Sequence, residues 1–222
     1  MTNFVHELER RQDAYFSAMS EEDVRLVREA DQAMKDAFTY EDAIQAGEQA
    51  PDFDLPMAGG GRLNLASAIR NGPVVVSFYR GRWCPFCSLE MDALARVHDT
   101  LEEIGASLVA ISPQSEAATS AMRDAHKVGF PMLIDREARV SERYGLLYEL
   151  PAPIRQMSQQ TGLEPVRRDG SPQWLVPVPA TYVIGEDRRV RYSFLDINYR
   201  NRLDPQLLSE IVARLRSQQL QS

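Results

Sequence analysis

Short apolar runs alternate with amphipathic stretches along most of the chain. Five runs rich in β-branched and aromatic side chains predict buried strands at residues 74–79, 106–111, 130–134, 180–184 and 190–195. Three- and four-residue apolar spacing predicts helices through 94–104, 115–127, 137–144 and 205–215. This alternation predicts an α/β fold around a largely parallel sheet, made mixed by antiparallel pairing of the last two strands.

The first 46 residues have a helical pattern of their own. Ser20, followed by three acidic residues, predicts an N-cap that divides two helices. We expect residues 1–46 to be a helical extension used for packing or for an oligomer contact, a homodimer included. Residues 47–222 are then one domain, in which the glycines at 59–61 predict the turn of a hairpin. The proline-rich stretch 146–178 predicts a long irregular insertion.

The two cysteines of the chain lie in one segment, Trp83-Cys84-Pro85-Phe86-Cys87, between a predicted strand and a predicted helix. The first turn of a helix has unpaired N–H groups and the positive end of the helix dipole, which favour an anion. A thiolate is the anion that this segment supplies, and thiolates are the nucleophiles of thiol–disulfide exchange. The spacing therefore indicates a redox-active dithiol.

Two other interpretations of the cysteines are weaker. Inert core cysteines are common, but a C-x-x-C at a strand–helix junction that uses both cysteines is improbable by chance. A zinc site needs four ligands, and His6, His98 and His126 show no paired spacing near the cysteines. We expect no metal and no cofactor.

Composition and charge argue against some classes of binding partner. The net charge is −7 and the isoelectric point about 5.1, which argues against nucleic acid or an anionic membrane surface. No apolar run approaches the roughly 20 residues that span a bilayer. The polar N-terminus lacks the apolar core of a secretory signal, so a cytoplasmic location is expected. In that reducing compartment a C-x-x-C pair is more often catalytic than structural.

Several segments resemble the peroxiredoxins of the AhpC/TSA family. They are the stretch GEQAPDFDL at 47–55, the pair Phe78-Tyr79, Glu90, and Tyr144-Gly145. The resemblance implies a thioredoxin-like fold, a central mixed sheet flanked by helices, over roughly residues 47–215. It also implies peroxide chemistry and an external thiol reductant.

The peroxidase site of that family is not intact here. Its proline, its threonine or serine, and its peroxidatic cysteine fall on Arg80, Cys84 and Cys87, so only the cysteine matches. The family's later arginine falls near Pro179, where no arginine stands. The segment Trp-Cys-x-x-Cys instead resembles the thioredoxin active site. Val178-Pro179 resembles the thioredoxin segment whose proline is cis, so we expect a cis bond that faces the dithiol.

The first hypothesis is a dithiol–disulfide oxidoreductase. Cys84, expected to be the more exposed cysteine, attacks a protein or small-molecule disulfide, and Cys87 resolves the mixed disulfide. Arg80 and Arg82 flank the turn and are expected to lower the pKa of the nucleophile, or else to be plain surface charges. At the site we expect Trp83 and Phe86 to form an apolar rim, or one of them to pack under the helix, and Pro85 to stiffen the loop.

Two alternatives stay open. In a thioredoxin-dependent peroxidase, Cys87 is the peroxidatic cysteine and Cys84 resolves, although the hydroxyl and arginine expected around the peroxide are missing. In a redox-responsive interaction protein, the dithiol switches residues 146–178 between conformers. In any of these cases we expect residues 146–178 to lie beside the dithiol, with Trp174 and Leu175 as its apolar contacts.

Two polar features carry weaker expectations. Asp135 follows a predicted strand and is a candidate for the active edge, because parallel sheets place their sites at the carboxyl ends of strands. The polar-aromatic stretch 192–200 after the last strand is interpreted as a cap on the sheet edge.

Overall fold

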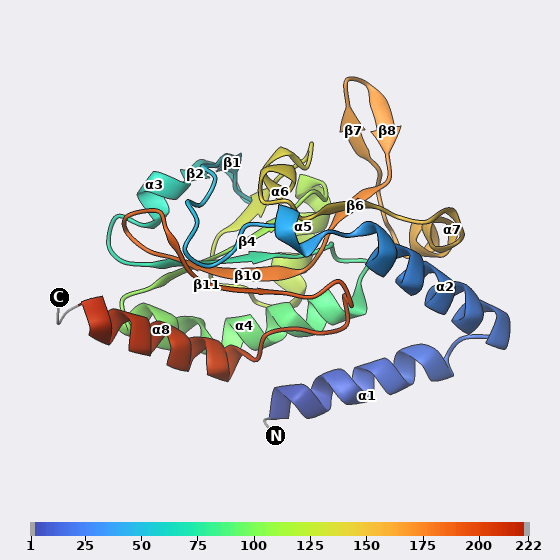
Figure 1. Ribbon diagram of the computed structural model, residues 1–222, viewed down its shortest axis with the longest axis horizontal. Helices are drawn as coiled ribbons and strands as arrows, with labels where there is room; N and C mark the ends of the chain where they lie inside the picture. Colours follow the sequence, from blue (N-terminus) through green and yellow to red (C-terminus); the bar gives the residue numbers. More distant parts are fainter. Residues whose placement is uncertain (1–2, 220–222) are drawn as a thin grey trace.

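A five-stranded mixed sheet forms the centre of the computed structural model, which describes residues 3–219 (Figure 1). Its strand order is β11-β10-β3-β4-β5. The strands are β3 (Val74–Phe78), β4 (Ser107–Ser112), β5 (Met132–Ile134), β10 (Ala180–Ile184) and β11 (Val190–Leu195). β3, β4 and β5 are parallel, whereas β10 is antiparallel to both β3 and β11. The predicted α/β fold with a mixed sheet is confirmed.

The residues of each strand alternate between two apolar cores. On β3, Val75 packs with one cluster, and Val74 and Val76 with the other, as the two-residue period of a strand requires. The first face is covered by α4 (Pro85–Glu103), α5 (Glu116–Ala125) and α8 (Pro205–Gln219). The second face is covered by α3 (Leu65–Ala68), α6 (Arg139–Arg143) and the hairpin of β1 (Asp54–Pro56) and β2 (Arg62–Asn64). Both faces of the central sheet are therefore buried.

Two N-terminal helices lie against the first face. They are α1 (Asn3–Ser17), which packs on α4, and α2 (Glu21–Ala37); a short 3-10 turn, η1 (Tyr40–Asp42), follows. The predicted division at Ser20 is confirmed, since its side chain accepts a hydrogen bond from the backbone N–H of Asp23. No helix within residues 3–219 is long and apolar enough to cross a membrane.

The stretch 146–178 is more ordered than expected. It contains β6 (Leu147–Glu149), α7 (Ala152–Gln160), β7 (Val166–Arg168), β8 (Ser171–Gln173) and β9 (Leu175–Pro177). β6 pairs with β9, and β7 with β8 in a hairpin that projects from the body of the protein (Figure 1). The prediction of an irregular insertion is therefore wrong, because strands of three residues are too short to give a readable period.

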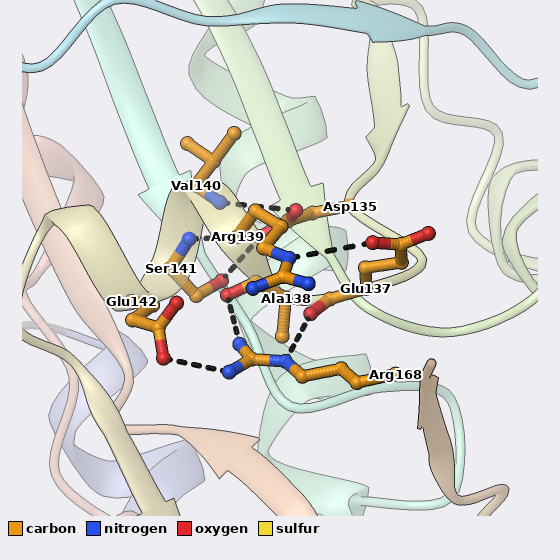
Figure 2. A network of polar contacts seen from close by, with 8 residues as sticks. All are labelled: Asp135, Glu137, Ala138, Arg139, Val140, Ser141, Glu142 and Arg168. Carbon is orange, nitrogen blue, oxygen red and sulfur yellow. Dashed lines mark hydrogen bonds and ion pairs between the residues drawn. The ribbon is translucent and has the colours of Figure 1, made fainter. Parts of the chain in front are cut away.

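Asp135 has a structural role at the end of β5. Its carboxylate accepts hydrogen bonds from the N–H groups of Val140 and Ser141 and from the Ser141 hydroxyl (Figure 2). From the β7–β8 hairpin, Arg168 donates to the Glu137 and Ala138 carbonyls of the same turn. The expectation that Asp135 faces the active edge is wrong, since this carboxylate is used by the first turn of α6.

Candidate active site

The dithiol lies where β3 passes into α4. Cys84 is the N-cap of α4, Pro85 opens the helix, and Cys87 sits in its first turn. The backbone N–H of Cys87 donates to the Cys84 carbonyl at 3.1 Å. The predicted position at a helix N-terminus is therefore confirmed. Both thiols are free and buried, with exposed fractions of 1% for Cys84 and 0% for Cys87, so Cys84 is the more exposed, as predicted, but by only 1%.

The loop before the cysteines depends on one glycine. Gly81 has a φ of +141°, and a Cβ there would lie 2.7 Å from the indole nitrogen of Trp83. The loop is also fixed by Gln114, whose side-chain oxygen accepts from the Arg82 N–H at 2.8 Å and whose nitrogen donates to the Tyr79 hydroxyl at 2.8 Å. A positive φ and a close side-chain contact together make glycine the residue that fits position 81.

The two thiols have opposite acidities. Burial opposes ionisation of Cys84, but a hydrogen bond from Cys87 and the charges of Arg80 and Arg202 lower its pKa to about 5. Burial, the hydrogen bond to Cys84 and the nearby Cys84 charge raise the pKa of Cys87. At neutral pH the pair therefore holds one thiolate, on Cys84, and one thiol, on Cys87, that donates to it.

A buried arginine that the sequence did not indicate contacts the second thiol. Arg202 has 1% of its side chain exposed, and its Nη2 donates to the Sγ of Cys87 at 3.3 Å. Its Nε donates to Glu90 at 2.7 Å, and Glu90 also accepts from the Ser77 hydroxyl at 3.4 Å. Burial raises the pKa of Glu90 to about 7 against the opposing charge of Arg202.

Arg80 is a buried cation of a different kind. Its guanidinium contacts two aromatic rings, at 4.6 Å from the centroid of Trp83 and 3.9 Å from that of Tyr199. It forms no ion pair with any residue in 3–219, and its Nε has no hydrogen-bond partner there. The groups whose negative charge favours this buried cation are Tyr148, Cys84, Tyr199 and Cys87, and of these only Cys84 has a lowered pKa. Arg82, in contrast, is exposed.

A cavity of about 490 Å³ opens beside Cys84. Its apolar wall comes from the N-terminal helices and α7, which gather at the end of the sheet where α4 begins (Figure 1). The apolar and aromatic lining side chains are Tyr15, Met19, Val27, Trp83, Pro85, Ile154, Met157 and Tyr199. Arg11, Arg80 and Arg82 line it as well, with Ser88, Ser158 and Thr161. Cys84 is part of the lining, whereas Cys87 is not, so a molecule in the cavity meets Cys84 first.

The remaining site expectations have mixed outcomes. Trp83 and Pro85 line the cavity, but Phe86 is fully buried and packs edge-on against Tyr15 and Tyr199. The stretch 146–178 does lie beside the dithiol, as predicted, although through Ile154 and Met157 of α7 and not through the expected Trp174 and Leu175.

The expected cis proline is absent. No peptide bond within residues 3–219 is cis, so Val178–Pro179 is trans. Val178 instead continues the β6–β9 ladder by donating its N–H to the Leu146 carbonyl at 2.7 Å. Both residues are buried and neither lines the cavity. The prediction of a cis bond facing the dithiol is wrong, which removes one of the two thioredoxin-like features.

Comparisons with known proteins point to one family. The sequence profile of the AhpC/TSA family matches residues 46–193. Peroxiredoxin Bcp of Bacillus subtilis is 27% identical over 101 residues, which cover 46% of this chain and 64% of that protein. The thiol-disulfide oxidoreductase ResA of the same organism is 28% identical over 108 residues, 48% of this chain and 59% of that protein. The matched stretch is thus less than two thirds of the length of these two relatives.

Solved structures support the fold. Peroxidoxin BcpB of Mycobacterium tuberculosis aligns with a TM-score of 0.58 at 23% identity, over 78% of this chain and 97% of that one. The reduced 2-Cys peroxiredoxin of Plasmodium vivax aligns with a TM-score of 0.62 at 19% identity, over 79% and 84%. The fold is therefore the thioredoxin-like fold of peroxiredoxins.

Proposed function

The chain belongs to the AhpC/TSA family, and we propose that it is a thiol oxidoreductase that reduces small-molecule disulfides through Cys84 and Cys87. One observation carries this proposal: the thiol with the lowered pKa, Cys84, is the one that lines the cavity, and the thiol behind it stays protonated. Relatives of both kinds, peroxiredoxins and a thiol-disulfide oxidoreductase, support thiol redox chemistry in general.

The reaction has two displacement steps. The Cys84 thiolate attacks one sulfur of a disulfide R–S–S–R′, the S–S bond breaks, and R′S⁻ leaves and takes a proton from water. Cys87 then attacks the Cys84 sulfur, its proton passes to the departing thiolate, and RSH leaves as the Cys84–Cys87 disulfide forms. Two electrons pass from the dithiol to the substrate, and an external thiol, of the kind that a reducing cytoplasm contains, returns them.

The burial of Cys84 restricts the substrate to small molecules. A protein disulfide must bring its own backbone to the attacking sulfur, but Cys84 is buried and lines a cavity of about 490 Å³ to which α1, α2 and α7 contribute side chains. That volume lies within the range of small-molecule sites, roughly 300–1,000 Å³. We therefore expect reduction of bis(2-hydroxyethyl) disulfide and not of insulin.

The stoichiometry of thiol release tests the proposal. Reduced wild type should release two molecules of 2-mercaptoethanol per chain from bis(2-hydroxyethyl) disulfide. Cys87→Ser should release one and keep the other half as an adduct, and Cys84→Ser should release none at a comparable rate. Release by Cys84→Ser at the wild-type rate would refute the assignment of Cys84 as the attacking residue.

One observation favours a peroxidase as the second candidate. The sequence shows no counterpart of the family's arginine for Cys87. In the structure, the Arg202 side chain donates to the Sγ of Cys87 at 3.3 Å, and the backbone N–H of Arg80 donates to it at 3.4 Å. In that reaction Cys87 attacks the peroxide O–O bond and becomes a sulfenic acid, water or an alcohol leaves, and Cys84 condenses with the sulfenic acid. Single-turnover peroxide consumption separates the two candidates, because Cys84→Ser retains it only if Cys87 is peroxidatic.

A further inference from the structure

The cavity beside Cys84 is lined by three arginines. We propose that it selects disulfides in which the half retained on Cys84 carries a carboxylate on an apolar body. This inference rests on the proposed function, because it names the substrate class for the same cysteine.

Apart from the Cys84 thiolate, the charged side chains at the cavity are of one sign. Arg11, Arg80 and Arg82 line it, and no carboxylate from residues 3–219 does. The chain as a whole carries 32 acidic and 25 basic residues, so this local excess of cations runs against the net charge of −7. Arg11 and Arg82 are exposed, and neither side chain has a hydrogen-bond or ion-pair partner in the described chain. Unpaired cations around a concave site attract anions to it.

The first step of the reaction removes the negative charge beside Arg80. Before the reaction, the Cys84 thiolate offsets Arg80, which is buried and has no ion pair within residues 3–219. Formation of the mixed disulfide removes that charge, since Cys84 becomes neutral and R′S⁻ departs with the electron pair. A buried cation without a counter-charge is strongly unfavourable. A carboxylate on the retained group R replaces the lost charge, so the intermediate with an anionic R is the more stable one.

The rest of the lining favours an apolar body. Met19, Val27, Ile154 and Met157 offer apolar contacts in the cavity that Cys84 lines, and the remaining neutral polar side chains there are the hydroxyls of Ser88, Ser158 and Thr161 and the two tyrosines. A ligand that fills this space removes apolar surface from water on both partners. The carboxylate is then drawn to the arginines while the carbon chain lies among the apolar side chains.

A pair of matched disulfides tests the charge preference. The two substrates are 3,3′-dithiodipropionate and bis(2-hydroxyethyl) disulfide, which differ in carrying carboxylates or hydroxyls. The rate at which the protein reduces each disulfide is divided by the rate at which N-acetylcysteine reduces the same disulfide. This ratio cancels differences in the intrinsic reactivity of the two disulfides. We expect wild type to prefer the carboxylated disulfide by about tenfold or more, and the preference to fall as salt is added, because these charges are screened.

Arginine variants locate the source of the preference. In Arg11→Gln and in Arg82→Gln we expect the preference ratio to fall about threefold or more, since each removes one unit charge near the carboxylate. Arg10→Gln is the matched control: Arg10 is exposed on the same helix, carries the same charge and does not line the cavity. Its ratio should equal that of wild type.

Failure of the charge preference can be distinguished from failure of the proposed reductase function. A wild-type ratio near one, or an equal fall in Arg10→Gln and Arg11→Gln, overturns the inference and leaves the disulfide reductase intact. Absence of thiol release from either disulfide overturns the proposed function as well. An equilibrium measurement on Cys87→Ser is independent of rates: its adduct with 3-mercaptopropionate should be more stable than that with 2-mercaptoethanol, and equal stability contradicts the inference.

Discussion

Replacement of Arg80 with methionine tests the electrostatic basis of the thiolate. Methionine keeps an unbranched apolar side chain but removes one of the two buried cations that lower the pKa of Cys84. The Cys84 pKa lies at about 5, against an ordinary value of 9.0. Loss of one nearby opposite charge shifts a pKa by about 1–3 units, so we expect about 7 in Arg80→Met. At pH 7 the thiolate fraction then falls from about 99% to about half.

Ultraviolet absorbance of the thiolate, followed against pH, measures this shift without requiring a reagent to reach the buried sulfur. The same titration of Cys84→Ser is subtracted to isolate the Cys84 signal. Arg82→Met is the matched control, because Arg82 is exposed and its charge is not among those that lower this pKa. A midpoint for Arg80→Met that stays near 5, or an equal shift in Arg82→Met, would show that the Arg80 charge does not stabilise the thiolate.

Three further substitutions address stability. Burial raises the pKa of Glu90 to about 7, so ionisation of Glu90 lowers the stability of the folded protein as the pH rises from about 4.5 to 7. The unfolding free energies of wild type and Glu90→Gln are measured by urea denaturation. The wild-type value minus the Glu90→Gln value should fall across that pH range. Gly81→Ala should cost about 1–3 kcal/mol more than Gly60→Ala, which shares a positive φ but meets nothing within 4 Å; equal costs would exclude the Trp83 contact as the cause. Phe86→Ala should cost about 3–5 kcal/mol in the same denaturation, and a cost below about 1 kcal/mol would contradict its place in the core.

The features predicted correctly from the sequence are those that depend on local patterns. β3, β10 and β11 are uniform apolar or alternating runs, and Ser20 is followed by the acidic residues of a helix start. The position of Cys84 and Cys87 followed in the same way, from a strand, a turn and an amphipathic helix in sequence. Each of these signals lies within a few residues of the feature that it predicts.

The features that were missed depend on contacts between distant residues. Arg202 lies 112 residues from Glu90 and 115 from Cys87, and no spacing rule links them. The cavity at Cys84 is lined in part by side chains of α1, α2 and α7, and the pattern within α4 does not encode these contacts. The stretch 192–200 was a partial signal, because it contains Tyr199, whose ring stacks on Arg80, yet its sequence alone suggested only a cap on the sheet.

Mapping of the trapped intermediate shows which cysteine attacks the disulfide. Reduced Cys84→Ser and Cys87→Ser are each exposed to limiting 3,3′-dithiodipropionate, quenched in acid and digested, and the modified cysteine is identified by mass spectrometry. We expect a mercaptopropionate adduct on Cys84 in Cys87→Ser, and far slower modification of Cys87 in Cys84→Ser. Faster modification of Cys87 than of Cys84 would contradict it, and would make Cys87 the attacking cysteine of this site.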